Sequence, residues 1–259
     1  MSTNNLAASK PIVFMLHGFP NTSQIWQRQV PEIAKHAQVV LLTFPTSASN
    51  CTIPSIIDVI ASKVRETKLK NPGSKIVFVG HDMGACLLNE VASQYPGLVN
   101  SQILINGGGI RQIGLRLFKW RQFRKSYYVG IFCMPFITNV VKKFARMVVE
   151  ILVYRGEASL IAKELKKSEL NDFDHIYLYK LLILYFFSGK SQPVTSTETI
   201  FVVGEDDPYL LSPSQKELER FFRKCHFFKL NSGHWSPFTN YQIVNQIIKN
   251  NLQALGAIS

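Results

Sequence analysis

The pentapeptide Gly80-His81-Asp82-Met83-Gly84 constrains the fold of this chain more than any other segment. An apolar run of strand length, residues 76–79, precedes it, and a helix-like stretch, residues 85–95, follows it. A strand, a sharp turn and a helix in this order expose a reactive side chain at the tip of the turn, because glycines on both sides let the neighbouring backbones approach. The pattern therefore predicts a nucleophile at Asp82.

The side chain at the tip of this turn is a carboxylate, whereas such turns usually carry serine. A carboxylate attacks without first losing a proton, and it can displace a leaving group from a saturated carbon to form an ester on the enzyme. The alternative is that Gly-x-Asp-x-Gly is an ordinary loop in which Asp82 only caps the following helix. The rest of the sequence has to decide between these interpretations.

Runs of strand length alternate with helical patterns along the chain. A continuous apolar run occupies residues 12–16, and strands are also predicted at 39–44, 75–79, 102–105, 199–203 and 226–230. Apolar side chains at helical spacing lie over residues 26–34 and 56–64, and a last helix is expected over 239–252. This rhythm predicts an α/β fold with a mostly parallel sheet flanked by helices.

The rhythm breaks between residues 107 and 193. There the chain is helical, basic and aromatic, with no alternation typical of strands. We interpret residues 107–193 as a helical insert between two strands. Residues 1–106 and 194–259 would then form one α/β core.

The net charge of +12, from 29 Lys and Arg against 17 Asp and Glu, is concentrated in this insert. Residues 111–125 alone hold six basic side chains and no acid. Such a patch attracts phosphate groups, so weak association with an anionic membrane surface is one interpretation. A solvated helix face is the simpler one. No nucleic-acid motif accompanies the patch, so nucleic acid is not an expected partner.

Composition and cysteine usage indicate a cytoplasmic protein. The longest apolar candidate for a membrane span, residues 176–187, is too short and contains Lys180, and residues 1–10 lack the apolar core of a secretory signal. The four cysteines form no CxxC pair and have no metal-ligand spacing; they are Cys51, Cys86, Cys133 and Cys225. We expect reduced, mostly buried thiols and no metal site.

Three further motifs follow predicted strands. The loop His17-Gly18-Phe19-Pro20 can turn the amide of Phe19 inward, to form an oxyanion hole with the amide of Met83. The segment 204–208 offers Asp206 and Asp207, either of which could orient a histidine.

The third motif is Ser232-Gly233-His234-Trp235. His234 comes after the acid, which comes after the nucleophile, and this is the order expected for a hydrolase built on such a sheet. Four motifs in the expected order, each at the end of a strand, favour catalysis over the ordinary-loop interpretation.

These motifs together resemble the α/β-hydrolases, in the branch that includes epoxide hydrolases and haloalkane dehalogenases. His-Gly-x-Pro and Gly-His-Trp beside an aspartate turn are most similar to epoxide hydrolases. The resemblance implies a cis Phe19–Pro20 bond and selects Asp207 over Asp206 as the acid. It also implies that residues 107–193 are the helical cap of this family.

Epoxide hydrolases place two cap tyrosines over the nucleophile. The segments 126–135 and 176–180 resemble the two cap segments that carry them, which implies these roles for Tyr128 and Tyr179. Packing is the alternative for each. The chain also departs from the family, because Met83 stands where a tryptophan is common, and that loss weakens any halide site.

The expected activity is therefore the hydrolysis of an epoxide in a small apolar substrate, without cofactor or metal. Asp82 would form a covalent ester that a water activated by His234 hydrolyses. Alternatives on the same fold are a dehalogenase, a carboxylic ester hydrolase and a non-catalytic protein that binds lipid or a partner. The sequence leaves the oligomeric state open.

Overall fold

A single parallel sheet organises the computed structural model, which describes residues 9–45, 51–133, 177–191 and 194–258. Its strands are β1 (Ile12–Leu16), β2 (Gln38–Leu42), β3 (Ile76–His81), β4 (Ser101–Ile105), β5 (Glu198–Gly204) and β6 (Cys225–Leu230). The strand order is β2-β1-β3-β4-β5-β6, and each of the five strand pairings is parallel. The carboxyl ends of all six strands therefore meet at one edge.

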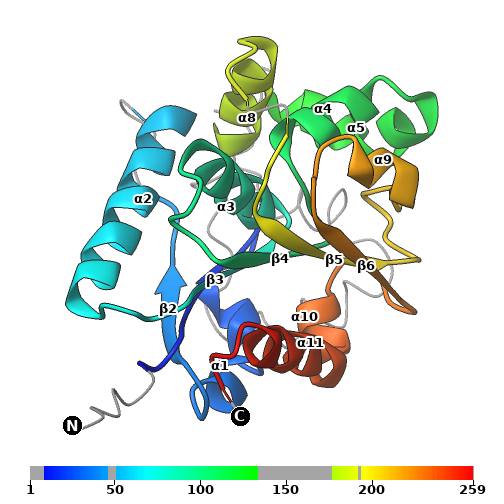
Figure 1. Cartoon of the computed structure of the whole chain (residues 1–259). Coiled ribbons are helices and arrows are strands. Elements are labelled where there is room, and N and C mark those ends of the chain that lie inside the picture. Colours follow the sequence, from blue (N-terminus) through cyan, green and yellow to red (C-terminus); the bar gives the residue numbers. More distant parts are fainter. Residues whose placement is uncertain (1–8, 46–50, 134–176, 192–193, 259) are drawn as a thin grey trace, which may run out of the picture.

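Helices cover both faces of this sheet (Figure 1). One face carries α2 (Ile53–Lys70) and α3 (Met83–Gln94), and the other carries α1 (Val30–Ile33), α10 (Ser236–Thr239) and α11 (Tyr241–Ala254). Two short helices complete the core, η1 (Ser23–Trp26) and α9 (Gln215–Glu219). This arrangement confirms the predicted fold class.

Strand side chains alternate between two apolar cores. Phe14 and Phe78 pack with the α2 and α3 side chains, whereas Val13 and Val77 pack with those of α11. All four side chains are fully buried. Because both faces are covered, the strands read in the sequence as continuous apolar runs.

Several boundaries differ from the predicted ones. The helical spacing over 26–34 belongs to two short helices, because Pro31 starts a new helix in α1. The last helix begins at Tyr241, after α10 has ended at Thr239. Strand β3 runs on to His81, which pairs with Ile105 of β4. The short helix α9 was not predicted.

The prediction of mostly buried thiols is wrong for three of the four cysteines. All four are free, but only Cys86 is buried, and Cys51, Cys133 and Cys225 are half-buried. Cys86 lies on α3 directly beneath the turn at Asp82, whereas the other three lie nearer the surface.

The predicted insert 107–193 is described in two parts, which contain α4 (Ile110–Leu117), α5 (Trp120–Cys133) and α8 (Tyr177–Phe187). Residues 134–176 and the predicted boundary at 193 lie outside the described residues. The three helices lie together above the edge where the strands end (Figure 1). Within the described ranges, no helix is both long and apolar enough to cross a bilayer.

A close approach between α3 and β1 shapes the strand edge. A Cβ atom at Gly84 would collide with the carbonyl oxygens of Leu16 and His17, which are backbone atoms that cannot move independently. Gly130, on α5, faces open space. These two helical glycines therefore form a matched pair for substitution.

We predict that Gly84→Ala lowers the free energy of unfolding by about 1–3 kcal/mol, because the methyl group overpacks the α3–β1 contact. Gly130→Ala should instead raise it by roughly 0.5–1 kcal/mol, the usual gain of alanine over glycine in a helix. Urea unfolding followed by circular dichroism measures both. Equal stability of the two variants would contradict the close approach.

Candidate active site

Asp82 stands on a strained turn between β3 and α3. Its φ is +51° and its ψ is −120°, a conformation that residues other than glycine rarely adopt. Backbone hydrogen bonds hold the turn on both sides. The amide of Asp82 donates to the main-chain oxygen of Ile105 (3.1 Å), and the amide of Cys86 donates to the main-chain oxygen of Asp82 (3.3 Å). The turn directs the carboxylate into the space beneath the insert helices. This is the geometry that the Gly80–Gly84 pentapeptide predicts.

The loop after β1 brings a backbone amide to this carboxylate. Phe19 N–H donates to Asp82 Oδ2 at 3.2 Å, and Met83 N–H also donates to the Asp82 carboxylate. A Cβ atom on Gly18 would collide with the Asp82 side chain, so only glycine lets the loop come this close. The Phe19–Pro20 bond is cis, as predicted.

His234 joins Asp82 to a second carboxylate. His234 Nδ1 donates to Asp207 Oδ2 at 2.7 Å, and His234 Nε2 lies 3.7 Å from Asp82 Oδ1. The bond to Asp207 leaves the lone pair of Nε2 facing Asp82. Asp207 is fully buried and Asp206 is exposed, so the geometry selects Asp207 as the partner of His234.

Asp207 is saturated with hydrogen bonds. Its Oδ1 accepts from the amides of Tyr209 (2.7 Å) and Leu210 (2.9 Å), and its Oδ2 also accepts from Asn106 Nδ2 (2.9 Å). Burial by itself would raise the pKa of Asp207, but His234 and these amides hold that pKa below its ordinary value. Asp207 is therefore an ionised anchor for the histidine ring.

Burial also acts on the other two groups. It raises the pKa of Asp82, against the opposing effects of His234 and of the amides of Met83 and Phe19. Burial would lower the pKa of His234, but Asp207 and Asp82 nearby raise it above the ordinary value. The three groups are thus electrostatically coupled within one dry site.

Two tyrosines from the insert helices cover Asp82. Tyr128 of α5 and Tyr179 of α8 meet edge to face, with ring centroids 6.0 Å apart, and their hydroxyls are hydrogen-bonded to each other. Both line a cavity of about 80 Å³ together with Asp82 and Met83. Burial raises the pKa of each tyrosine well above 10, so both hydroxyls keep their protons. All the residues predicted for the site therefore gather in one place.

Two buried residues of the site were missed from the sequence. His81 Nε2 donates to the main-chain oxygen of His234 (2.9 Å), and Asn106 Nδ2 donates to that of Gly233 (3.0 Å) as well as to Asp207. Asn106 has a φ of +45° and directly follows β4, so its position at a strand end was a usable signal. For His81 the signal was its place beside Asp82.

Helix α5 is bonded to the loop that follows Asp207. Lys125 Nζ donates to the main-chain oxygen of Asp207 (2.5 Å), and Ser126 Oγ donates to that of Tyr209 (3.0 Å). Gln122 donates to the same oxygen of Tyr209 and accepts from the amide of Leu211. These hydrogen bonds fix the position of α5 relative to Asp207, the residue that anchors His234.

The described residues, those of this site included, contain no group of three or more His, Cys, Asp or Glu side chains placed to hold a metal ion. The polar groups around Asp82 are backbone amides, phenol hydroxyls and one imidazole. This set can stabilise an oxyanion, donate protons and activate water.

Comparison with known proteins agrees with this architecture. A family model described as the α/β hydrolase fold matches residues 11–128. Epoxide hydrolase 3 of Mus musculus is 25% identical over 262 residues, which cover 95% of this chain and 71% of the mouse protein. The chain is therefore similar to the α/β-hydrolases in fold and, at low identity, in sequence.

Solved structures show the same fold. An epoxide hydrolase from Bacillus megaterium, crystallised with an inhibitor, superposes with a TM-score of 0.74 at 19% identity, covering 94% of this chain and 93% of that one. A putative acyltransferase from Salmonella enterica reaches 0.76 at 14% identity, covering 95% and 89%. The expected α/β-hydrolase fold is thus confirmed, whereas the fold by itself selects neither the activity nor the substrate.

The missed residue His81 generates a stability prediction. Burial and the neighbouring His234 lower the pKa of His81 to about 3 from 6.5. As the pH falls below 6.5, His81 therefore binds a proton in the unfolded chain but stays neutral in the folded protein. The contribution of the neutral, buried His81 to the free energy of unfolding is present above pH 6.5 and is lost as the pH falls toward 3.

We predict that the wild-type protein loses about 2 kcal/mol more stability between pH 7.5 and 5 than a His81→Gln variant. Glutamine keeps an N–H donor for the His234 carbonyl but does not titrate. Denaturant unfolding across this pH range measures the difference. His226→Gln, at an exposed ring, should keep the wild-type slope. An unchanged slope in His81→Gln would contradict the burial of a neutral His81.

Proposed function

We propose that this protein hydrolyses an epoxide on an apolar molecule to a diol, through a covalent ester on Asp82. The observation that carries the proposal is a half-buried carboxylate that accepts two backbone amides, faces a carboxylate-anchored imidazole and lies beneath two protonated tyrosines. The epoxide hydrolases among its relatives support the substrate class.

In the first step, Asp82 attacks a ring carbon of the epoxide. Phe19 N–H holds Oδ2, so Oδ1 is the oxygen left to attack. The carbon–oxygen bond of the ring breaks, its electron pair moves to the oxygen, and Tyr128 or Tyr179 donates a proton to that oxygen. The ring oxygen stays on the ester as a hydroxyl, and the raised pKa values of the tyrosines favour recovery of the donated proton from solvent.

In the second step, water hydrolyses the ester. His234 Nε2 takes a proton from a water that attacks the carboxyl carbon of Asp82, and Asp207 stabilises the imidazolium that forms. The oxyanion develops on Oδ2, which the amide of Phe19 already holds, and the amide of Met83 also donates to this carboxyl group. The ester bond breaks, the His234 imidazolium protonates the departing alkoxide, and the diol leaves. The remaining carboxyl proton passes to solvent, which restores the Asp82 carboxylate.

The substrate is expected to be apolar. Apart from the reacting groups and Ser126, the catalytic cavity is lined by side chains without charge or strong donors, including Leu117, Val129 and Ile183. The halide of a haloalkane would need N–H donors beside the nucleophile, but Met83 presents a thioether to this cavity. This favours an epoxide over a haloalkane.

Replacing His234 should trap the ester. We predict that His234→Gln, incubated with a pool of apolar epoxides, gains the full mass of one epoxide on the peptide that contains Asp82, because ring opening releases no leaving group. Mass spectrometry of the digested protein measures it. The double variant Asp82→Asn with His234→Gln should stay unlabelled, and a label on another residue would overturn the assignment.

The tyrosines are tested in the same background. We predict that Tyr128→Phe or Tyr179→Phe slows adduct formation by His234→Gln on the order of 10²-fold, because each removes a proton donor for the ring oxygen. Tyr127→Phe is the matched control, since Tyr127 neighbours Tyr128 but does not line the cavity. Equal rates in all three variants would exclude the tyrosines from the reaction.

A further inference from the structure

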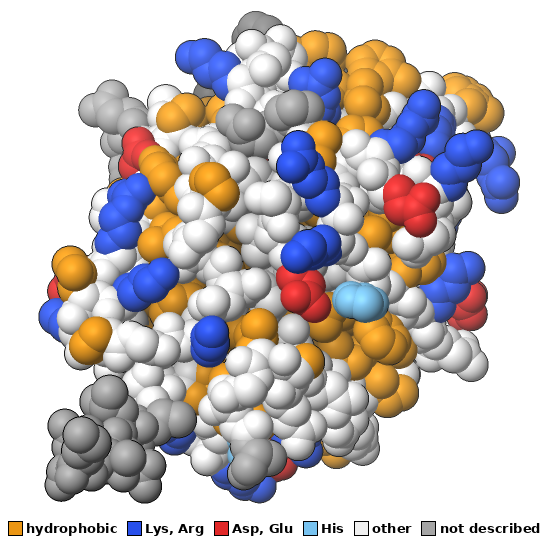
Figure 2. Space-filling model, in the orientation of Figure 1, with side chains coloured by type: hydrophobic (Ala, Val, Ile, Leu, Met, Phe, Trp, Pro, Cys, Tyr) orange, Lys and Arg blue, Asp and Glu red, His pale blue; other side chains and the backbone are white. Residues whose placement is uncertain are grey.

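A second apolar feature lies on the outer side of α4, α5 and α8. Six large hydrophobic side chains there are exposed to solvent; they are Leu115, Phe118, Trp120, Phe123, Leu184 and Phe187. We call these six residues the aromatic face. In Figure 2, hydrophobic and basic side chains mingle along the upper edge, where Figure 1 places these helices.

The rings of this face are grouped rather than scattered. Trp120 and Phe123 stack with centroids 5.9 Å apart, and Phe118 contacts Phe186 and Phe187 at 6.3 Å. Single exposed apolar residues need no explanation, but a contiguous apolar patch marks a surface that binds something. Trp120 and Phe118 are each 70% exposed, so they meet solvent across most of their area.

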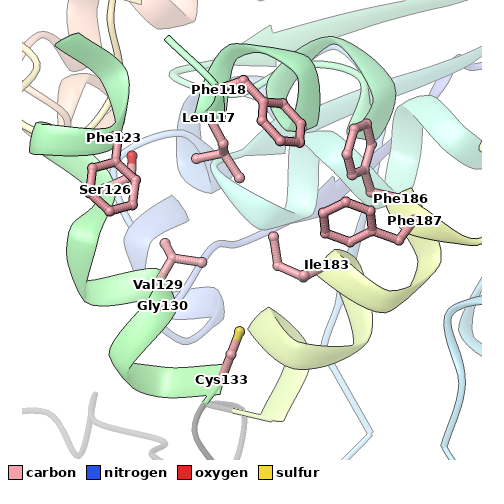
Figure 3. Close-up of a pocket in the computed structure, with 11 residues that line it drawn as sticks. Leu117, Phe118, Phe123, Ser126, Val129, Gly130, Cys133, Ile183, Phe186 and Phe187 are labelled. Atoms are coloured by element: carbon pink, nitrogen blue, oxygen red, sulfur yellow. The ribbon is translucent and has the colours of Figure 1, made fainter. Parts of the chain in front are cut away.

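An apolar pocket of about 310 Å³ opens within this face, between α5 and α8 (Figure 3). Phe118, Phe123 and Phe187 line it from the surface. Four of its lining residues also line the catalytic cavity; they are Leu117, Ser126, Val129 and Ile183. The pocket and the cavity at Asp82 therefore adjoin, with these four residues lining both.

The helices that carry the face are basic, and Glu217 of α9 pairs with two of their cations, Arg116 and Lys119. Residues 107–133 hold six Lys or Arg and residues 177–191 hold two, and neither range contains an acid. Arg121 and Arg124 of α5 follow Trp120 and Phe123 in the chain and are exposed. The six acidic residues of 107–193 fall between positions 150 and 174, outside the described residues.

We propose that the aromatic face docks on an anionic lipid bilayer, and that the pocket takes up apolar ligands as they leave the membrane. Aromatic rings that insert at the headgroup level, flanked by Arg and Lys that meet anionic lipid, are the chemistry of an interfacial surface. A second copy of this chain fits less well, because pairing the two faces would bring like charges together. The delivery of a ligand from the pocket to Asp82 rests on the proposed function, whereas the docking of the aromatic face on a bilayer does not.

Tryptophan fluorescence can report docking directly. The chain has three tryptophans, of which Trp26 and Trp235 are buried and Trp120 is exposed. On vesicles of phosphatidylcholine with phosphatidylserine, the emission should shift to the blue, and brominated lipids should quench it. Vesicles of phosphatidylcholine alone should give a much smaller change.

Vesicle sedimentation with variants tests both parts of the surface. Arg121→Gln with Arg124→Gln should lower the partition coefficient roughly 30-fold, about fivefold for each basic residue removed. Trp120→Ser should also weaken binding. The matched controls are Lys63→Gln with Lys75→Gln, and Leu69→Ser, all exposed positions of the core. These controls should bind as the wild-type protein does.

Three outcomes would overturn the proposal. The first is absence of binding to anionic vesicles, and the second is equal binding by the face variants and the control variants. The third is a dimer, or a complex with an acidic protein, that forms without vesicle binding and that the face variants break. The binding readout needs no turnover, so it is independent of the proposed function. If that function holds, the arginine variant should keep wild-type activity on a water-soluble epoxide and lose it on a vesicle-embedded one.

Discussion

The structure depends on one unfavourable placement, a half-buried carboxylate at Asp82 beneath the insert helices. Burial penalises its charged form, and two backbone amides and the ring of His234 offset that penalty. The offset requires the loop at Gly18 to approach closely, which no side chain larger than hydrogen allows. The strained turn, the glycines and the position of His234 all follow from this requirement.

The helices that lie over the site are also bonded to its anchoring loop. Helix α5 supplies Tyr128 to the catalytic cavity, and its Gln122, Lys125 and Ser126 bind the loop that begins at Asp207. A displacement of α5 would therefore move a proton donor and disturb the anchor of the histidine together. The described helices of the insert contribute residues to the site and also carry the aromatic face. The same helices therefore connect the cavity at Asp82 with the exposed surface.

Most residues of the candidate site could be predicted because their signals are local. A parallel sheet brings the carboxyl ends of its strands to one edge, so Asp82, Asp207 and His234 could be grouped from their positions after strands. Asn106 satisfies the same rule but was overlooked because its amide has no catalytic role of its own. The break between η1 and α1 was missed because apolar spacing over 26–34 does not register the effect of Pro31 on the backbone.

The amino-acid sequence by itself determined the α/β class, the turn that exposes Asp82 and the order of nucleophile, acid and histidine. Spacing and residue type carry that information, because strand periodicity and turn chemistry are local properties. The family resemblance favoured Asp207 over Asp206, but only the tertiary structure shows that Asp207 meets His234 and that a second apolar pocket adjoins the cavity at Asp82. Neighbouring residues on a turn point in different directions, and a pocket exists only where separate helices pack.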